Sequence, residues 1–164
     1  MVKKAKDSSD GSTPEEVYQL KVILDGIRPL IWRRIQVRGD ISLFKLHNIM
    51  QIVMGWQDYH LHRFEIEGES YSVISKEADM LADDFIDEKK VRLNRVIPRE
   101  KFMFAYEYDF GDSWSHTILV EKIFKPEEEL EHPVCLKGKR SAPPEDCGGE
   151  SGYYHLLKTL RDRS

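Results

Sequence analysis

The sequence predicts an α+β fold, with a mixed or mainly antiparallel sheet around a central β-hairpin, one helix packed on the sheet and a C-terminal helix. Three observations support this class. Side chains alternate with the period of a strand over residues 102–124, apolar residues recur at helical spacing over residues 42–54, and a further helical pattern begins near Ser151. When the shorter alternating segments are counted as further strands, we expect a sheet of about five to seven strands.

The central hairpin is the strongest pattern in the chain. Phenylalanine and tyrosine occupy every second position over residues 102–110, so one face of this strand is expected to be buried. Gly111 and Asp112 form a turn pair, and the alternation resumes over residues 114–124 as the returning strand.

Two registers of this hairpin are compatible with the sequence, and a shift of one residue turns every side chain to the other face. A two-residue loop, 111–112, suits a type II′ turn and would set Glu107 opposite His116. A three-residue loop, 111–113, would place Trp114 on the face of the aromatic stripe. The hydrophobic pattern favours the second register.

Two further hairpins are expected before the central one. Residues 17–25 alternate between apolar and polar side chains, and a second extended segment begins at Pro29. Residues 60–67 alternate again and turn at 68–69 into a short partner strand.

The helix over residues 42–54 lies between these hairpins. Ser42 or Asp40 is placed to cap its first turn, and Gly55 is placed to end it.

The remaining segments carry weaker signals. Residues 75–100 read as a long variable connection with an acidic run over residues 79–87, which we interpret as solvated surface. Residues 133–149 read as a loop that leads into the final helix.

Length and composition predict one domain. Residues 1–13 have the composition of a disordered tail, and residues 14–164 are long enough for one well-buried core, since domains commonly run to about 100 to 150 residues. The net charge of −4 and the pI of 5.9 do not attract phosphate backbones or anionic membranes to the molecule as a whole.

The same data indicate a cytoplasmic protein without a membrane segment. No apolar run approaches the roughly 20 residues that span a bilayer, and the first residues lack the apolar core of a signal peptide. We expect Cys135 and Cys147 to be free thiols in a reducing compartment.

Asp109, Asp112 and His116 are the first candidates for chemistry. Two aspartates at a turn with an imidazole nearby are able to hold a divalent cation or to act as an acid and base pair. The structural alternative, which we favour for these three taken alone, is that the aspartates serve turn geometry and the histidine is packed.

His60 and His62 form a second candidate. They lie two residues apart, so on a strand both imidazoles would project from one face and be able to share a metal ion. Cys135 and Cys147 lack the spacing of a structural zinc knuckle, and we give a site that joins them to His60 or His116 a lower weight.

A third candidate is the run PPEDCGG, which holds Glu145, Asp146 and Cys147 just before a helix. Its two glycines allow close backbone approach, and the helix start is able to hold an anion. An equally weighted alternative is that the two acids only offset the helix dipole. Cys147 has no histidine adjacent in sequence that would activate it as a nucleophile.

Basic and aromatic side chains occur together at two places. One set is Trp32, Arg33 and Arg34, and the other lies within residues 137–140. Such side chains stack on bases and bind phosphates, but strand arginines also protect edges and form ion pairs. Convergence of the two sets would favour nucleic acid as the partner.

Several short motifs recur in the order of a known family: WRR (32–34), LH (46–47), GW (55–56), HLHRF (60–64), YDFGDSWSH (108–116), and PPEDCGG followed by Gly152 and Tyr153. On these motifs, which extend from about Tyr18 to Tyr154, the chain resembles the Ri-plasmid ORF-three-like domain family, also found as the passenger protein of an insertion element. The resemblance implies an α+β domain encoded on plasmids or mobile elements in bacteria and archaea, and it implies no established activity.

We expect the polar motifs to converge at strand ends and loops, where binding residues usually lie. The catalytic candidates are Asp109, Asp112, His116, Glu145 and Asp146; the metal candidates are His60, His62, Asp109, Asp112 and His116; the binding candidates are Trp32, Arg33, Arg34, His60, His62, Trp114, Cys147 and Tyr153.

The leading hypothesis is a non-catalytic binding or accessory module that recognises a protein or nucleic-acid partner. The alternative is a phosphodiester hydrolase that uses a divalent metal ion as its cofactor, and convergence of three acids or histidines would favour it. A third hypothesis makes the polar motifs purely structural, which full internal pairing of buried polar atoms would favour. The sequence makes no prediction of oligomeric state.

Overall fold

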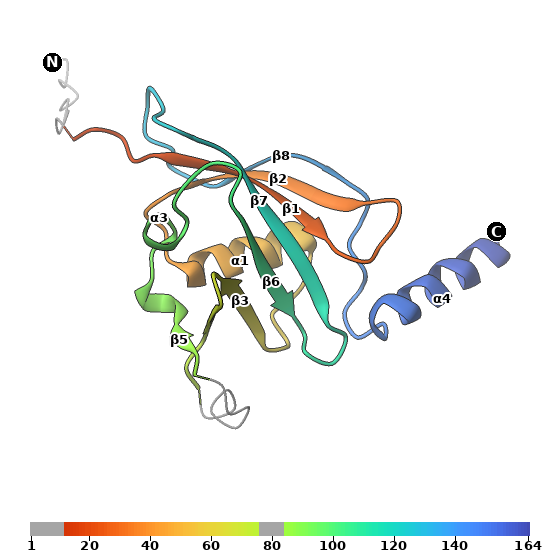
Figure 1. Ribbon diagram of the computed structural model, residues 1–164. Helices are drawn as coiled ribbons and strands as arrows, with labels where there is room; N and C mark the ends of the chain where they lie inside the picture. Colours follow the sequence, from red (N-terminus) through yellow and green to blue (C-terminus); the bar gives the residue numbers. More distant parts are fainter. Residues whose placement is uncertain (1–11, 76–83) are drawn as a thin grey trace, which may run out of the picture.

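The computed structural model describes residues 12–75 and 84–164, and it has an eight-stranded sheet and several helices (Figure 1). The strands are β1 Val17–Leu24, β2 Ile31–Arg38, β3 His62–Ile66, β4 Glu69–Ser72, β5 Ile86–Asp87, β6 Met103–Tyr108, β7 Trp114–Phe124 and β8 Val134–Lys139. The helices are α1 Leu43–Met54, the 3-10 helix η1 Glu88–Lys90, α3 Leu93–Val96 and α4 Gly149–Asp162. All but two residues of the predicted tail, 1–13, lie outside the described residues.

The sheet has the order β5-β4-β3-β6-β7-β1-β2-β8, and every pair is antiparallel except β4 with β5. The β6–β7 hairpin lies in the interior of the sheet, with β3 on one side and β1 on the other, and the α+β fold predicted from sequence is confirmed. The sheet has eight strands rather than five to seven because two short or exposed strands, β5 and β8, join its edges.

The central hairpin has the face that the hydrophobic pattern favoured and a longer loop than either predicted register. Trp114 pairs with Tyr108, so the chain turns through residues 109–113, and Glu107 lies opposite Ser115. Asp109 and Ser113 adopt left-handed backbone angles, with φ of 61° and 57°, which lets this wider turn close.

Helix α1 packs on one face of the sheet and lies behind β6 and β7 in Figure 1. The Ser42 side chain accepts a hydrogen bond from the Lys45 amide, and Gly55 ends the helix at φ 75°, so both predicted boundaries are confirmed. Fully buried side chains of α1 and of the strands, including Leu46, Met50 and Tyr106, form one apolar core.

The segment predicted as a loop at residues 133–149 contains a strand, and this prediction is wrong. Strand β8 pairs with β2, but all six of its residues are exposed. A strand at the edge of a sheet needs no buried face, so its sequence shows no alternation of apolar and polar residues.

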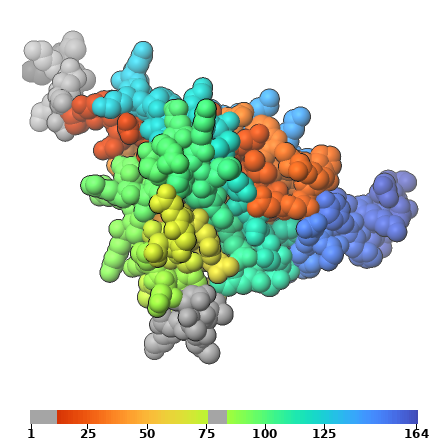
Figure 2. Space-filling model, viewed as in Figure 1, coloured from red at the N-terminus to blue at the C-terminus, as the bar shows by residue number. Residues whose placement is uncertain are grey.

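Helix α4 projects from the body of the protein and contacts it near its start (Figures 1 and 2). The Tyr154 hydroxyl accepts a hydrogen bond of 2.9 Å from the Arg28 amide in the turn between β1 and β2. Among the described residues, none of the helices is long and apolar enough to cross a membrane.

Candidate functional site

One imidazole and three carboxylates meet at the end of the sheet where β6 ends and β7 begins. The Nε2 atom of His60 lies 2.7 Å from Asp146 Oδ1, 3.5 Å from Asp109 Oδ2 and 3.8 Å from Glu145 Oε2. We call these four residues the surface cluster. Its members come from segments that are far apart in sequence, and all four were candidates from sequence.

The distances in the surface cluster suit the ligands of one ion. Nitrogen and oxygen ligands lie about 2.1 Å from a zinc-sized ion and are therefore about 3.0 Å from one another in octahedral geometry and about 3.4 Å in tetrahedral geometry. The ligand atoms of His60, Asp109 and Asp146 all lie within 4.8 Å of one another. His60 Nε2 is buried and makes no hydrogen bond of normal geometry, although Asp146 is 2.7 Å away.

Two of the carboxylates use one oxygen each to bind the scaffold. Oδ1 of Asp109 accepts hydrogen bonds from the amides of Gly111 and Asp112, at 3.0 and 3.3 Å. Oε1 of Glu145 accepts from the Tyr108 hydroxyl and the Gln57 amide, both at 2.9 Å. In each case the other oxygen is the one nearest to His60.

The backbone around the surface cluster is held in uncommon conformations. Asp109 and Asp146 have φ values of 61° and 55°, in the left-handed region that aspartate adopts more readily than most residues. Asp112 connects the two loops, because its Oδ2 accepts a hydrogen bond of 3.2 Å from the Gly148 amide. Strained backbone of this kind is common where side chains must be placed for a ligand.

Tyr108 of β6 holds two of the loops that form the surface cluster. Its hydroxyl accepts a hydrogen bond of 3.0 Å from the Tyr59 amide and donates to Glu145. Burial and the Glu145 carboxylate raise the pKa of the Tyr108 phenol well above its usual value, so it stays protonated and keeps donating. The ring stacks on Trp56 with centroids 4.9 Å apart.

A chain of buried hydrogen bonds fixes the loop that leads to His60. The Gln51 side chain donates to the Tyr106 hydroxyl at 3.0 Å, and this oxygen lies 2.7 Å from His47 Nδ1. His47 Nε2 lies 2.9 Å from Asp58 Oδ1, and the Asp58 amide donates back to Gln51 Oε1 at 2.8 Å. We call this closed chain the Gln51 ring; it joins α1, β6 and the loop after α1.

Sequence reasoning did not select His47, Asp58, Tyr108 or Glu88 as site residues. The signal for His47 is its position in α1 between Leu46 and Met50, on the face that packs on the sheet. Asp58 and Glu88 carry no local signal, because their partners come from other elements.

The structure does not bring His116 or His62 into the surface cluster. His116 is fully buried, its Nδ1 atom donates to the Tyr106 carbonyl oxygen at 3.1 Å, and burial lowers its pKa to about 4. His62 points into the core and contacts Glu88 instead, because β3 begins at His62 and leaves His60 outside the strand. The shared strand face expected for His60 and His62 is therefore wrong.

Three other candidates are packed rather than presented to solvent. Trp114 and Tyr153 are buried, with relative exposures of 2% and 6%. Cys147 is half-buried, and burial together with Asp112 raises the pKa of its thiol, so it is a poor nucleophile. Cys135 lies exposed on β8, and both cysteines are free thiols.

The two basic sets identified in the sequence lie side by side on paired strands. Trp32 is paired with Lys139 and Arg34 with Lys137, and the Lys21 ammonium lies 4.8 Å from the centre of the Trp32 ring. Arg34 also forms an ion pair of 2.7 Å with Glu121, which offsets part of the charge.

Arg33 lies on the other face of β2 from Trp32 and Arg34. Its Nε atom donates to the Val53 carbonyl oxygen at 2.9 Å and ties β2 to α1. Arg33 therefore has a structural contact rather than an exposed binding surface.

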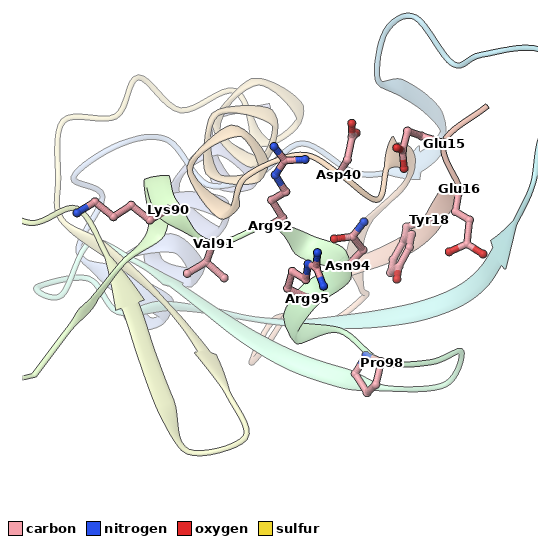
Figure 3. A pocket seen from close by; sticks show the side chains of 10 residues that line it. All are labelled: Glu15, Glu16, Tyr18, Asp40, Lys90, Val91, Arg92, Asn94, Arg95 and Pro98. Carbon is pink, nitrogen blue, oxygen red and sulfur yellow. The ribbon is translucent and has the colours of Figure 1, made fainter. Parts of the chain in front are cut away.

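The cavity shown in Figure 3 lies away from the surface cluster. It has a volume of about 970 Å³ and is lined by acidic and basic side chains, among them Glu16, Asp40, Arg92 and Arg95. Tyr18, at the opposite end of β1 from the surface cluster, also lines it. Its mixed charges favour no single ligand, so we place the candidate site at the surface cluster, where the ligand-type atoms converge.

The chain is similar to proteins of unknown function. It is 37% identical to the uncharacterized protein y4hQ of Sinorhizobium fredii over 147 residues, which are 89% of this chain and 74% of that protein. It is also 39% identical in sequence to the protein of unknown function MM3350 from Methanosarcina mazei Go1, whose crystal structure matches this one with a TM-score of 0.79. The match covers 91% of this chain and 83% of that one. Residues 16–164 match the plasmid pRiA4b ORF-3-like protein family. The chain therefore belongs to the plasmid pRiA4b ORF-3-like protein family.

Proposed function

We propose that this protein is a non-catalytic binding module that holds a divalent cation at the surface cluster and presents it to an anionic group of a partner. His60, Asp109 and Asp146 are the ligands, and Glu145 lies beside them. Carboxylate oxygens with one imidazole suit Mn²⁺, Zn²⁺ or Mg²⁺.

One observation carries this proposal. Asp109 and Glu145 each hold the scaffold with one carboxylate oxygen and face His60 with the other. Metal sites are built in this way, because hydrogen bonds from outside the ligand set orient the ligands before the ion binds. A carboxylate serving only the turn has no need to aim its second oxygen at an imidazole.

Solvent exposure supports access by a partner. The Asp146 side chain is 66% exposed and that of His60 is 29% exposed, so an ion held there would keep positions occupied by water. The residues Lys139 and Arg140 lead directly into the loop that carries Glu145, which favours a partner with negative charge. The sequence predicts a cytoplasmic protein that recognises a protein or a nucleic acid, and we propose that the partner is of one of these two kinds.

The test is calorimetric titration of the chelator-treated chain with Mn²⁺, Mg²⁺ and Zn²⁺. We expect the double variant Asp109→Asn and Asp146→Asn to lose cation binding at the surface cluster and to keep its circular dichroism spectrum. Asp112→Asn is the matched control, because Asp112 lies between the same loops and contacts Gly148 rather than His60. Equal Mn²⁺ binding by the double variant and the unchanged chain would reject the proposal.

A second candidate is a divalent-metal-dependent phosphodiester hydrolase. The convergence of His60, Asp109 and Asp146 within ligand distance favours it, since water on a bound ion becomes a nucleophile. Cleavage of single- or double-stranded nucleic acid that needs Mn²⁺ and is lost in the double variant would replace the binding module by the enzyme. Cation binding without cleavage would leave the binding module in place.

A further inference from the structure

A second group of ligand-type side chains lies between α1, β3 and η1, and three of its four members are buried. His47 of α1, Asp58 of the following loop, His62 of β3 and Glu88 of η1 form it, and we call it the buried cluster. The ligand atoms of His47, Asp58 and His62 all lie within 4.8 Å of one another. His62 Nε2 lies 2.8 Å from both carboxylate oxygens of Glu88.

The charge of the buried cluster is unusual for a protein core. Glu88 and His47 have no exposed surface, and His62 is 4% exposed. A carboxylate in such surroundings carries a large desolvation cost unless a positive charge lies close to it. Among the described residues, the hydrogen-bond partner of the Glu88 side chain is His62. His62 supplies this charge when it is protonated, and a dication bound to the imidazoles would supply it in its place.

The backbone places Glu88 at the buried cluster. The Leu43 amide at the start of α1 donates to the Val91 carbonyl oxygen at 2.9 Å, and Ser42 forms a β-bridge with Arg92. The Asp87 side chain accepts a hydrogen bond from the Lys89 amide and caps η1. The segment after residue 87 is therefore held against the helix that carries His47.

The ring of His47 is also oriented from outside the cluster. Its Nδ1 atom lies 2.7 Å from the Tyr106 hydroxyl, which in turn accepts from Gln51. This contact turns Nε2 toward Asp58. Histidine ligands of metal ions are usually held in this way through their second nitrogen.

We propose that the buried cluster is a second metal site, which takes a transition-metal dication of the Zn²⁺ class. His47, Asp58 and His62 supply two imidazole nitrogens and one carboxylate oxygen, three ligands of a tetrahedral ion, and Glu88 lies beside His62. His47 Nε2 and Asp58 Oδ1 lie 2.9 Å apart, less than the separation of about 3.4 Å between two ligands of a tetrahedral ion, so binding would move these two groups slightly apart. With two imidazoles, this set is softer than the surface cluster and discriminates better against Mg²⁺.

The consequence of this site is structural. Its ligands come from α1, the loop after it and β3, and Glu88 of η1 contacts His62, so a bound ion would add a further link between segments that hydrogen bonds already join. Both imidazoles are buried, and the ion would face solvent on the side of Asp58, whose side chain is 50% exposed.

The experiment uses the full chain with the surface cluster disabled by Asp109→Asn and Asp146→Asn. After chelator treatment, we titrate it with Zn²⁺ by calorimetry and with Co²⁺ by visible absorption. We expect one equivalent of Zn²⁺, the intense absorption of tetrahedral Co²⁺, and a higher unfolding temperature with Zn²⁺. Adding Glu88→Gln should weaken Zn²⁺ binding at least tenfold, whereas His132→Gln, an exposed histidine outside the cluster, should have no effect.

Two results would overturn the inference. One is a folded surface-disabled chain that binds no Zn²⁺ and gives no tetrahedral Co²⁺ spectrum. The other is Zn²⁺ affinity that is the same with and without Glu88→Gln. If Glu88→Gln fails to fold, His62→Gln and the Co²⁺ spectrum of the surface-disabled chain decide the question. Loss of Mn²⁺ at the surface cluster is read separately, so this inference and the proposed function fail independently.

Discussion

The imidazole rings of His47 and His62 lie face to face, with centroids 3.4 Å apart and planes inclined by 7°. Burial, and then the charge of His62, lower the pKa of His47 to about 4, so His47 is neutral at pH 7. A neutral imidazole accepts at one nitrogen and donates at the other. This is what the contacts of His47 with Tyr106 and Asp58 require.

Tyr106→Phe should destabilise the protein by about 1–3 kcal/mol. The substitution leaves the buried Gln51 amide and His47 Nδ1 without their shared partner, because both contact the Tyr106 hydroxyl. Urea unfolding measures the change. The control is Tyr59→Phe, since Tyr59 is 65% exposed and its hydroxyl donates to the exposed Gln57 side chain, which water is able to bond in its place. Equal costs for the two substitutions would contradict the role of the Gln51 ring.

Stability should fall between pH 6.5 and pH 4 because of His116. Burial lowers the pKa of His116 from 6.5 to about 4. Between these two pH values His116 therefore binds a proton in the unfolded chain and stays neutral in the folded chain. The free energy of unfolding therefore decreases with falling pH, by up to about 3 kcal/mol from this residue. The lowered pKa of His47 acts in the same direction.

His116→Gln checks this assignment. Its amide is able to donate to the Tyr106 carbonyl oxygen as Nδ1 does, and it takes up no proton. Urea unfolding of this variant at several pH values should give a shallower decline below pH 6.5, together with lower stability at pH 7. His155→Gln, on the exposed side of α4, controls for the loss of a histidine. An unchanged slope in His116→Gln would show that another group carries the pH dependence.

Tyr108→Phe should weaken Mn²⁺ binding at the surface cluster by roughly 10- to 100-fold. The Tyr108 hydroxyl orients Glu145 and holds the Tyr59 amide of the loop that carries His60. Calorimetric titration measures the affinity. The control is Tyr154→Phe, which removes a hydroxyl of α4 that accepts from the Arg28 amide. This substitution should leave the Mn²⁺ affinity unchanged. A Tyr108→Phe protein with full affinity would mean that Glu145 needs no orientation.

Two glycine substitutions should differ in severity. Gly55→Ala places a Cβ in open space and should cost about 1 kcal/mol, from the left-handed backbone alone. In Gly152→Ala the Cβ would collide with the Cys147 carbonyl group, so the turn beside Asp146 must move. We expect Gly152→Ala to lower both stability and Mn²⁺ affinity, measured by thermal unfolding and calorimetry. Similar effects of the two substitutions would contradict this close packing.

Residues with a periodic pattern could be placed from the sequence. The aromatic stripe of β6 and the apolar spacing of α1 have a buried face, and burial imposes a period of two or of about 3.6 residues. Strand β8 has no buried face, so nothing in its composition separates it from a loop. The register of the central hairpin depends on the left-handed Asp109 and Ser113, which the hydrophobic pattern does not report.

The surface cluster could be predicted in part for a related reason. His60, Asp109, Glu145 and Asp146 lie in loops beside strand or helix ends, where polar residues without a periodic role stand out. His116 and His62 occupy inward positions of strands, and whether such a histidine packs or binds depends on neighbours from other elements. The contact between Glu88 of η1 and His62 of β3 joins residues 26 positions apart in sequence, and no local pattern indicates it.

The Tyr108 hydroxyl joins two loops that are distant in sequence, through the Tyr59 amide on one side and Glu145 on the other. The Gln57 amide makes a second link to the same carboxylate. Local opening of either loop breaks the bonds of both, so the two should fluctuate as one cooperative unit. Amide hydrogen exchange would then proceed at a common rate at Gln57 and Tyr59, and an ion that ordered one loop would slow exchange in the other.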